Sequence, residues 1–293
     1  MSAKPEKAMK LSVIIPCLNV ADTIAIQLEA LANQDWSEPW EVIVSDNGST
    51  DETLAVVERY RGRLPNLQVV DSSDKRGAAH ALNVGVAAAH SEALAFCDAD
   101  DEVASRWAVA MSEALRKYDF VAGRFELAKL NPPWLQAKHA QQNGLNRFRS
   151  PSYLPHAGSG NMGVRRALHE AVGGFDESLP YLYDTDYCFK AQLAGAQLHF
   201  VPDAVVHIRR RSKFDDIFRQ GRNYGEYHVV LYKRYRPLGM PKLSWKASLE
   251  GWTHLLWQLT QVRSKAHLAN WVWNLGWRLG RLKGCIKHRV FAL

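Results

Sequence analysis

Short apolar runs alternate with segments of helical periodicity along the first hundred residues. The apolar runs, several of them rich in β-branched residues, cover 11–16, 40–44, 67–70 and 94–96. Between them, 24–31, 53–60 and 77–89 place apolar or small residues at helical spacing. Strands that alternate with helices in this way predict an α/β fold: a doubly wound, mostly parallel sheet with helices on both faces and right-handed crossovers.

The pattern becomes less regular in the middle of the chain. Four elements are expected there: a helix at 106–117, a strand at 120–127, a helix that begins at Tyr183, and a strand at 195–202 continued at 205–207. The glycine-rich element 158–163 leads into a helix that we expect to extend to Val172. The stretch 131–155 is too long for a plain connection, so we expect it either to be mobile or to form part of a binding site.

The C-terminal part of the chain has two further segments with helical periodicity. One apolar face is formed by Leu249, Trp252, Leu256 and Leu259, and a second by Leu268, Trp271, Leu275, Leu279, Leu282 and Ile286. Six of the ten tryptophans lie between Trp245 and Trp277. Neither segment has ~18 uncharged residues in a row, so neither should span a bilayer. We expect amphipathic helices that either lie on a membrane surface or pack on the rest of the chain or on a dimer partner.

The sign of the net charge also changes where the C-terminal part of the chain begins. From Arg209 onward there are 18 Lys/Arg and 4 Asp/Glu, a net charge of +14, whereas the preceding residues carry 19 and 26, a net charge of −7. We therefore expect a globular domain at residues 1–211 and a basic, tryptophan-rich helical extension at residues 212–293. A basic extension favours anionic lipid, phosphorylated ligands or nucleic acid, and no recognised nucleic-acid-binding module accompanies it, so we expect no nucleic acid partner.

Cysteine usage and the N-terminus indicate a reducing compartment. The four cysteines are widely separated and form no C-x-x-C pair, which argues against a zinc knuckle or a disulfide framework. Residues 1–10 are polar and carry lysines, without the apolar region of a signal peptide. We expect a cytoplasmic protein, peripheral on the cytoplasmic face of the inner membrane if the C-terminal helices bind lipid.

Polar residues follow each of the four predicted parallel strands, at 16–19, Asp46, 74–77 and 98–101. The carboxyl ends of parallel strands meet at one edge of a sheet, so these groups together predict a ligand crevice. Asp98 and Asp100 suit a hard divalent cation, Mg²⁺ or Mn²⁺, that keeps open positions for substrate phosphates. The same turn also suits a strand-to-helix loop with a helix cap, and capping is the role that we assign to Asp101.

Six short motifs occur in a characteristic order. They are Val-Ile-Ile-Pro-x-x-Asn from Val13, Ser-Asp-Asn-Gly-Ser-Thr-Asp from Ser45, Arg76-Gly77 followed by Asn83-Val84-Gly85, Asp98-Ala99-Asp100, Gly-Gly-Phe-Asp-Glu from Gly173, and Asp184-Thr185-Asp186. Over residues 12–211 the chain resembles the family 2 glycosyltransferases, which have the GT-A fold. The resemblance implies a nucleotide-binding half at 11–101 and an acceptor or catalytic half at 102–211.

The resemblance also implies roles for individual residues. On the donor side it places Pro16 and Asn19 in the nucleotide pocket, Asp46 on the nucleobase, Arg76 and Gly77 near the sugar and diphosphate, Asp98 on the ribose or metal, and Asp100 on the metal, with His207 as a further metal ligand. On the acceptor side it places Gly158, Ser159, Gly160 and Asn161. A lone histidine is more often structural, so that alternative stays open for His207.

Transfer with inversion needs a carboxylate that takes the proton of the acceptor hydroxyl. The resemblance favours Asp184 as this base, with Asp186 as the second choice, and the alternative is that both acids cap a helix. The chain departs from the family twice. Tyr183 stands where many members have glutamate, which leaves the choice of base open. Leu82 stands where many have arginine, so that contact is either absent or supplied elsewhere, with Lys75 and Arg76 as candidates.

The resemblance implies an inverting, metal-assisted glycosyltransferase. We expect it to move a sugar from a nucleotide-diphosphate sugar, a UDP-sugar in many members, to a hydroxyl of a carbohydrate or lipid-linked acceptor in bacterial surface polysaccharide or glycolipid assembly. The alternatives are an inactive sugar-nucleotide-binding or scaffold protein and a nucleotidyltransferase of related fold. The element 158–163 also matches G-x-G-x-x-G, but no central parallel strand precedes it, which argues against a nicotinamide enzyme.

Overall fold

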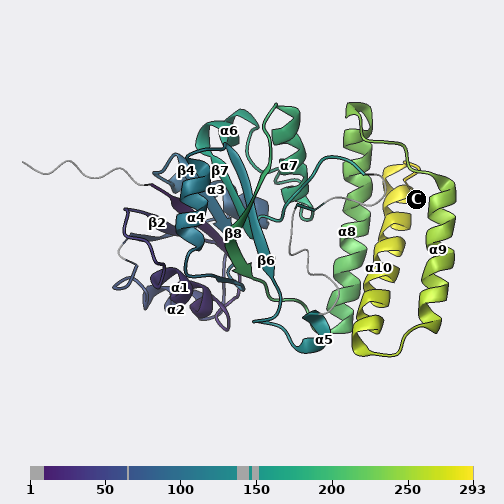
Figure 1. Ribbon diagram of the computed structural model, residues 1–293, viewed down its shortest axis with the longest axis horizontal. Helices are drawn as coiled ribbons and strands as arrows, with labels where there is room; N and C mark the ends of the chain where they lie inside the picture. Colours follow the sequence, from purple (N-terminus) through teal and green to yellow (C-terminus); the bar gives the residue numbers. More distant parts are fainter. Residues whose placement is uncertain (1–9, 65, 137–144, 147–151, 293) are drawn as a thin grey trace, which may run out of the picture. The chain divides into compact units, whose positions relative to one another are not determined.

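The computed structural model describes residues 10–64, 66–136, 145–146 and 152–292, which fall into two compact units (Figure 1). Unit 1 consists of residues 10–64, 66–130, 145–146 and 155–209. Unit 2 consists of residues 131–136, 152–154 and 210–292. Residues 137–144 and 147–151, which belong to the stretch expected to be mobile or part of a binding site, lie outside the described residues.

Unit 1 is built on one mixed sheet. Its strands are β1 Ser12–Cys17, β2 Glu41–Asp46, β3 Leu67–Asp71, β4 Ala93–Cys97, β5 Glu102–Val103, β6 Phe120–Glu126, β7 Asn161–Arg165 and β8 His199–His207. They lie in the order β3-β2-β1-β4-β7-β6-β8-β5. The pairs among β1 to β4, and the pair β6–β8, are parallel, whereas β7 and β5 run against their neighbours. The doubly wound first half is therefore as expected.

Helices cover both faces of this sheet. They are α1 Ile24–Ala32, α2 Thr53–Glu58, α3 Ala78–Ala88, α4 Trp107–Leu115, α6 Arg166–Ala171 and α7 Tyr183–Leu193. Successive residues of a strand point to opposite faces, so Val13 and Ile15 join the core beneath α1 and α4, while Ile14 joins the core beneath α3 and α7. An apolar core thus stabilises each face of the sheet, and the loops at the ends of its strands are available for ligand binding.

Strand β7 was not expected from the sequence. The glycine-rich element was predicted to lead directly into a helix, but residues Asn161–Arg165 form a strand and α6 begins only at Arg166. The strand pairs antiparallel with β4 on one side and β6 on the other, and Asn161 to Val164 are buried. Met162 and Val164 alternate with Asn161, Gly163 and Arg165, but a run of this length next to glycines does not by itself predict a strand, and pairing on both edges decides it.

Unit 2 is helical. It contains α5 Pro133–Gln136, α8 Phe214–Tyr235, the 3₁₀ turn η1 Arg236–Leu238, α9 Trp245–Thr260 and α10 Lys265–His288. Helices α8, α10 and α9 stand side by side in that order (Figure 1). The sequence predicted apolar helical faces for the segments that form α9 and α10. For the segment that forms α8 it predicted only that it belongs to a helical extension. In the described part of the chain, no helix is long and apolar enough to cross a membrane.

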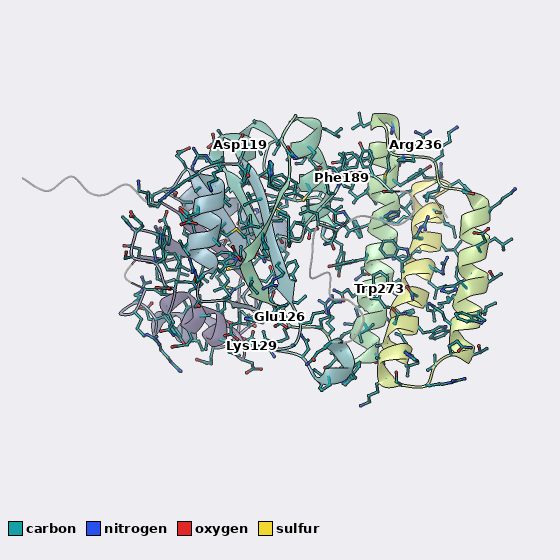
Figure 2. The ribbon with its side chains drawn as sticks, viewed as in Figure 1. Asp119, Glu126, Lys129, Phe189, Arg236 and Trp273 are labelled. Carbon is teal, nitrogen blue, oxygen red and sulfur yellow. The ribbon has the colours of Figure 1, made fainter. Side chains whose placement is uncertain are left out.

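Glycines allow α8 and α10 to approach closely. A Cβ on Gly225 of α8 would collide with the carbonyl oxygen of Trp277, and one on Gly280 of α10 with the carbonyl oxygen of Arg222. Figure 2 marks Trp273 on α10, whose ring stacks on that of Trp277 with centroids 5.3 Å apart. Beside this contact, Lys283 and Lys287 of α10 pair with the buried carboxylate of Glu226 on α8, at 2.7 and 2.9 Å. Close backbone contact and a paired buried charge together fix the register of the two helices.

Candidate active site

The loops after β1 and β2 are tied to each other. Asn19 has a left-handed backbone (φ 51°), and its Oδ1 accepts a hydrogen bond from the Thr50 N–H at 2.7 Å. The Asn19 N–H donates to Ser49 Oγ at 3.0 Å. Asp46 ends β2 with its carboxyl 6% exposed and accepts from the Ser49 N–H at 3.1 Å. Pro16 lies in the neighbouring strand β1, so these predicted donor-side residues share one sheet edge.

Asn47 holds the loop that precedes α3. Its Nδ2 donates to the carbonyl oxygen of Lys75 at 2.8 Å, and its Oδ1 accepts from the Gly77 N–H at 2.9 Å. Gly77 has φ 143°, a conformation that favours glycine. The exposed Arg76 donates through NH1 to the carbonyl oxygen of Asn47 at 3.0 Å. Arg76 and Gly77 are thereby fixed beside the loop after Asp46. Sequence reasoning gave Asn47 no role, although an asparagine before glycine in a turn is a signal of such bonding.

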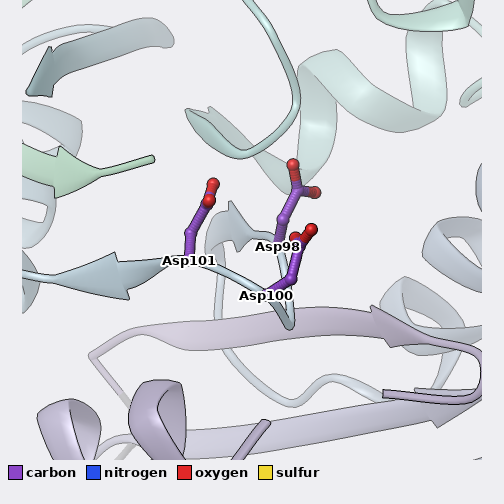
Figure 3. Close-up of side chains that lie close together, drawn as sticks. All are labelled: Asp98, Asp100 and Asp101. Carbon is purple, nitrogen blue, oxygen red and sulfur yellow. The ribbon is translucent and has the colours of Figure 1, made fainter. Parts of the chain in front are cut away.

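Three carboxyl groups gather in the turn between β4 and β5 (Figure 3). One oxygen from each of Asp98, Asp100 and Asp101 lies within 4.8 Å of the other two. The expectation that Asp101 caps a helix is wrong, because strand β5 follows it and α4 begins only at Trp107. Asp101 is 5% exposed and accepts a hydrogen bond from the backbone N–H of Arg209 at 2.7 Å. The cluster therefore has a third acid that the sequence did not assign to it.

These carboxyl groups repel one another. The pKa of Asp98 is raised to about 7, first by burial and then by the negative charges of Asp100 and Asp184. The pKa of Asp101 is raised to about 9 by burial and by Asp98 and Asp100, against the opposing hydrogen bond and charge of Arg209. A hard divalent cation would relieve this repulsion, and carboxylate oxygens are the ligands that it prefers. The donor set therefore fits Mg²⁺ or Mn²⁺.

The segment before β7 passes close to two of the acids. A Cβ on Gly160 would lie 2.9 Å from Asp98 Cγ, so a side chain there would displace the Asp98 carboxyl group. A Cβ on Gly158 would lie 3.6 Å from Asp184 Oδ2. The structure thus brings Gly160 close to Asp98 and Gly158 close to Asp184.

Asp184 lies in the first turn of α7. Burial raises the pKa of its carboxyl, against hydrogen bonds from the backbone N–H groups of Thr185, at 2.7 Å, and of Ser159. The residue at the start of the helix is Leu182, a non-glycine residue with a left-handed backbone (φ 59°). Such conformations cost energy and cluster at functional sites. The strained residue therefore sits directly before the helix turn that carries Asp184.

Two predicted site side chains are fully enclosed. Asp186 is 0% exposed, with Oδ2 3.9 Å from Lys190 Nζ. Asn161 is also 0% exposed: its Oδ1 accepts from Trp107 Nε1 at 2.8 Å, and its Nδ2 donates to two backbone carbonyls at 3.0 Å. Ser159 is 4% exposed, and its Oγ lies 3.1 Å from a tyrosine hydroxyl. The Asp186 and Asn161 side chains consequently offer no exposed atom to a bound acceptor.

His207 ends β8 and is held by β6. Its Nδ1 lies 2.6 Å from Glu126 Oε2, and in the strand register it faces both Glu126 and Glu102. Glu126 and Lys129 lie at the same end of β6 (Figure 2). Among the described residues, His207 is not a member of the three-carboxylate group. The sequence did not point to Glu126, which fixes the imidazole so that Nε2 is left for another partner.

A second acidic centre lies beneath α3 and is fully partnered. Glu177 accepts from Asn83 Nδ2 at 3.0 Å and from Lys75 Nζ at 2.6 Å, and it lies 3.1 Å from His80 Nδ1. Burial acts to raise the pKa of Glu177, but these hydrogen bonds outweigh it and hold the pKa at about 2. Asn83 also binds the backbone of Phe175 on both its N–H and its carbonyl. These bonds connect the motif that contains Asn83 with the Gly-Gly-Phe-Asp-Glu motif, so both motifs have a structural role here. Lys75, one candidate for the arginine contact missing at Leu82, is used here.

Comparison with known proteins shows what the chain is similar to. A family model described as "Glycosyl transferase family 2" matches residues 12–173. Glycosyltransferase AglE of Haloferax volcanii is 28% identical over 75% of this chain and 73% of its own length. Poly(ribitol-phosphate) beta-N-acetylglucosaminyltransferase TarS of Staphylococcus aureus is 40% identical over 32% of this chain, but that match spans 17% of TarS. The uncharacterized glycosyltransferase YibD of Escherichia coli is 37% identical over 32% of this chain and 27% of its own length.

Solved structures agree on the fold. Mannosyltransferase PcManGT from Pyrobaculum calidifontis, in complex with GDP-Man and Mn²⁺, has a TM-score of 0.65 at 19% identity and covers 98% of this chain and 90% of its own. S. aureus TarS 1-349 in complex with UDP has a TM-score of 0.54 at 19% identity and covers 97% and 93%. The mixed sheet with helices on both faces is the GT-A fold of these proteins, and the helical C-terminal region is present as expected.

Proposed function

Because the chain belongs to glycosyl transferase family 2 and is a glycosyltransferase, we propose that it moves a sugar from a nucleotide-diphosphate sugar to an acceptor hydroxyl with inversion at the anomeric carbon. The observation that carries this proposal is the meeting of Asp98, Asp100 and Asp184 around the backbone of Gly158 and Gly160. A leaving-group site and a candidate base are thereby placed next to each other.

The nucleoside binds along the loops after β1 and β2. Asp46 is buried at the end of β2, where a carboxylate can accept a hydrogen bond from a nucleobase N–H, and Pro16 and Asn19 form the neighbouring wall. A base without a matching donor would lose this hydrogen bond, although Asp46 would keep its bond from the Ser49 N–H, so the contact contributes to the choice of base. Uracil presents such a donor, and a UDP-sugar is the donor that we propose. Arg76 and Gly77 lie beside the same loop and face the diphosphate or the sugar.

Asp98 and Asp100 hold the divalent cation, with Asp101 behind them and His207, fixed by Glu126, as a further ligand. When bound, Mg²⁺ or Mn²⁺ stabilises the negative charge that develops on the diphosphate leaving group. The acids hold the cation in the turn after β4, and the Gly160 backbone leaves room for the donor because it carries no side chain.

Asp184 is the base. Its carboxyl lies next to the glycine segment and close enough to Asp98 for its charge to raise the pKa of Asp98. Burial raises the pKa of Asp184 itself, which favours proton uptake from an acceptor hydroxyl. Asp186, the second candidate, is fully buried and cannot reach a substrate. On the acceptor side, Gly158, Ser159 and Gly160 contribute backbone, and Asn161 acts by holding β7 in place.

The acceptor is a carbohydrate or a lipid-linked saccharide of bacterial surface polysaccharide or glycolipid assembly. This proposal rests on the chemistry of the site together with the names of relatives such as TarS. The catalytic domain that we propose spans residues 1–211, with the donor half at 11–101 and the acceptor half at 102–211, and residues 212–293 are the proposed extension. Of the described residues in the first range, 131–136, 152–154 and 210–211 belong to the helical unit 2.

A panel of nucleotide sugars tests the proposal. The full chain is incubated with UDP-, GDP- and dTDP-sugars, with Mn²⁺ or with EDTA, and release of the nucleoside diphosphate and the thermal midpoint are measured. We expect one donor to raise the midpoint and to be turned over only with the cation. Donor binding without turnover would favour the inactive sugar-nucleotide-binding protein, and pyrophosphate exchange would favour the nucleotidyltransferase.

We also propose that unit 2 attaches the enzyme to an anionic membrane surface. Helix α9 exposes 58% of Leu249, 67% of Leu256 and 57% of Trp257, and the neighbouring segment carries Arg263 and Lys265. Exposed apolar side chains next to basic ones suit the boundary between lipid headgroups and acyl chains. Full-length protein should float with phosphatidylglycerol vesicles, and Trp257→Ala should weaken this. Protein that stays in the soluble fraction would instead favour a packing or dimer role for the helices.

A further inference from the structure

A pocket of about 300 Å³ lies at the edge of unit 1 opposite the candidate active site. Its walls come from the end of α1, from Trp36 and Trp40 before β2, and from Asn66 before β3. Trp40 directly precedes the first residue of β2, whereas Asp46 is the last, so the length of the strand, roughly 17 Å, separates the two regions. The pocket is therefore distinct from the nucleotide site.

Two tryptophan rings form the apolar part of the pocket. Their centroids are 6.1 Å apart with planes inclined at 40°, and both side chains are half-buried and packed against the core on one side. Throughout the described ranges, no protein group accepts a hydrogen bond from the indole N–H of Trp36 or Trp40. A half-buried tryptophan N–H usually finds a partner. Each ring thus presents an apolar face and an unused donor.

Polar groups stand next to these rings. Ser37 and Glu38 line the pocket between the two tryptophans, and in the described part of the chain neither side chain has a hydrogen-bond or ion-pair partner. Arg63, on the opposite wall, is already paired with Glu29 through two nitrogens, one of them at 2.9 Å. The pocket therefore offers unused donors and acceptors but no unpaired positive charge.

The walls are fixed before any ligand arrives. Asn66 Nδ2 donates to the carbonyl oxygen of Trp40 at 2.8 Å. The Arg63 guanidinium lies over the Tyr60 ring, 5.8 Å from its centroid, and the Tyr60 hydroxyl donates to the backbone of α1 at 3.0 Å. A site whose walls are already ordered loses little entropy on binding. The pocket has the form of a small-ligand site, with aromatic walls and a few convergent polar groups.

We propose that this pocket binds a sugar ring of a neutral glycan. A pyranose has apolar C–H faces, which lie against aromatic rings, and a rim of hydroxyl groups that both donate and accept hydrogen bonds. Trp36 and Trp40 supply faces and N–H donors, while Glu38 and Ser37 supply acceptors. A purely apolar ligand would bury these polar groups without partners. A phosphorylated ligand would meet the Glu38 charge, while Arg63, the cation among the described lining residues, is already paired with Glu29.

The pocket is a second saccharide site on the catalytic unit, apart from the place of transfer. Since it lies at the opposite edge of the sheet, it would hold a ring of a glycan that is already assembled and not the ring that receives the new sugar. The kind of ligand proposed for the pocket follows from the residues that line it. It does not depend on which sugar donor or which catalytic base the transfer uses.

Binding of defined oligosaccharides tests the proposal. The full chain is titrated with cellohexaose, maltohexaose and chitohexaose up to 20 mM, and binding is followed by calorimetry and by saturation-transfer NMR. We expect at least one to bind with Kd between about 0.1 and 5 mM. Trp36→Ala should weaken it at least about tenfold, and Glu38→Gln about threefold. Trp36 is chosen because it lies farther than Trp40 from the start of β2 at Glu41.

Control variants separate this pocket from other sites. Trp257→Ala, which removes an exposed tryptophan of α9, should leave the Kd unchanged, as should Asp100→Asn and saturating UDP. Failure of all three oligosaccharides to bind, or equal binding by Trp36→Ala of native thermal midpoint, would overturn the proposal. Competition by UDP or loss with Asp100→Asn would also overturn it, because the sugar would then occupy the transfer site. None of these results bears on metal-dependent donor turnover, which is measured separately.

Discussion

Two groups of acids in unit 1 have opposite electrostatics. In the turn after β4, the half-buried Asp98 has a pKa raised to about 7 by desolvation and then by the charges of Asp100 and Asp184. Beneath α3, Glu177 has a pKa held at about 2, because hydrogen bonds from neighbouring side chains outweigh the effect of its burial. Both belong to motifs that look alike in the sequence, as short runs of small and acidic residues.

The difference separates chemistry from scaffold. Acids that repel one another without internal compensation cost the protein stability, and such arrangements are typical of sites that await a ligand. Glu177, whose carboxylate is held by Asn83, Lys75 and His80, contributes to stability. We therefore infer that Asp98, Asp100 and Asp184 act on the donor and acceptor, and that Glu177 and Asn83 keep their surroundings in place.

The largest effect is expected at Asp184. Asp184→Asn should lower kcat about 10³-fold, because an amide cannot take the proton of the acceptor hydroxyl, while the Kd of the nucleotide changes less than about twofold. The thermal midpoint should not fall. Turnover with the preferred donor, together with calorimetric titration of UDP, measures both quantities.

Asp186→Asn is the matched control for that variant. Asp186 is fully buried two residues away, so its replacement should lower stability and leave kcat per folded molecule within a few-fold of the wild type. If Asp186→Asn abolished turnover in folded protein while Asp184→Asn did not, the assignment of the base would be reversed.

Glu177→Gln should lower stability by about 2 kcal/mol at pH 7, an amount discounted for the partial exposure of the side chain. The pKa of Glu177 is about 2 in the folded protein, below its ordinary value of 4.5. Its contribution is therefore fully present above pH 4.5 and is lost as the pH falls toward 2. Urea unfolding of both proteins at pH 7 and at about pH 3 measures the difference, which should shrink at the lower pH. A difference that grew on acidification would contradict the paired state of Glu177.

Asp98→Asn should have the smallest effect and the opposite sign. In metal-free protein, the variant should be more stable than the wild type by about 1 kcal/mol at pH 8, because it removes one of several like charges. Thermal unfolding in excess EDTA provides the measurement. A clear loss of stability would mean that the Asp98 charge is compensated within the protein, and the contrast with Glu177 would disappear.

The sequence predicted the parallel half of the fold and the edge at which the polar residues meet. Asp46, Gly77 and Asp98 follow strands that pair in parallel, and strand ends that follow one another in this way must converge. Prediction from the sequence failed where contacts between distant segments determine the secondary structure. Strand β7 forms because β4 and β6 pair with it, whereas the alternation of Met162 and Val164 with their neighbours is too short to predict a strand.

The sequence predicted which residue types form the candidate site. It did not predict the hydrogen-bond partners or the burial of the individual side chains. Asp101 was assigned to a helix cap because no local signal reveals the hydrogen bond from Arg209, more than one hundred residues away. Asn161 stands in the glycine-rich element, but its amide is consumed by Trp107 and by two carbonyl groups. Burial separates Asp184 from Asp186, and their spacing in the sequence does not.

Titration of metal-stripped protein with Mn²⁺ in the presence of UDP, followed by calorimetry, shows whether the turn after β4 holds the cation. We expect one cation per chain for the wild type and for Glu177→Gln, and at least about a hundredfold weaker binding for Asp100→Asn. Asp100 is exposed, so the variant should remain folded. Unchanged Mn²⁺ binding by Asp100→Asn would contradict the assignment of this turn as the cation and diphosphate site.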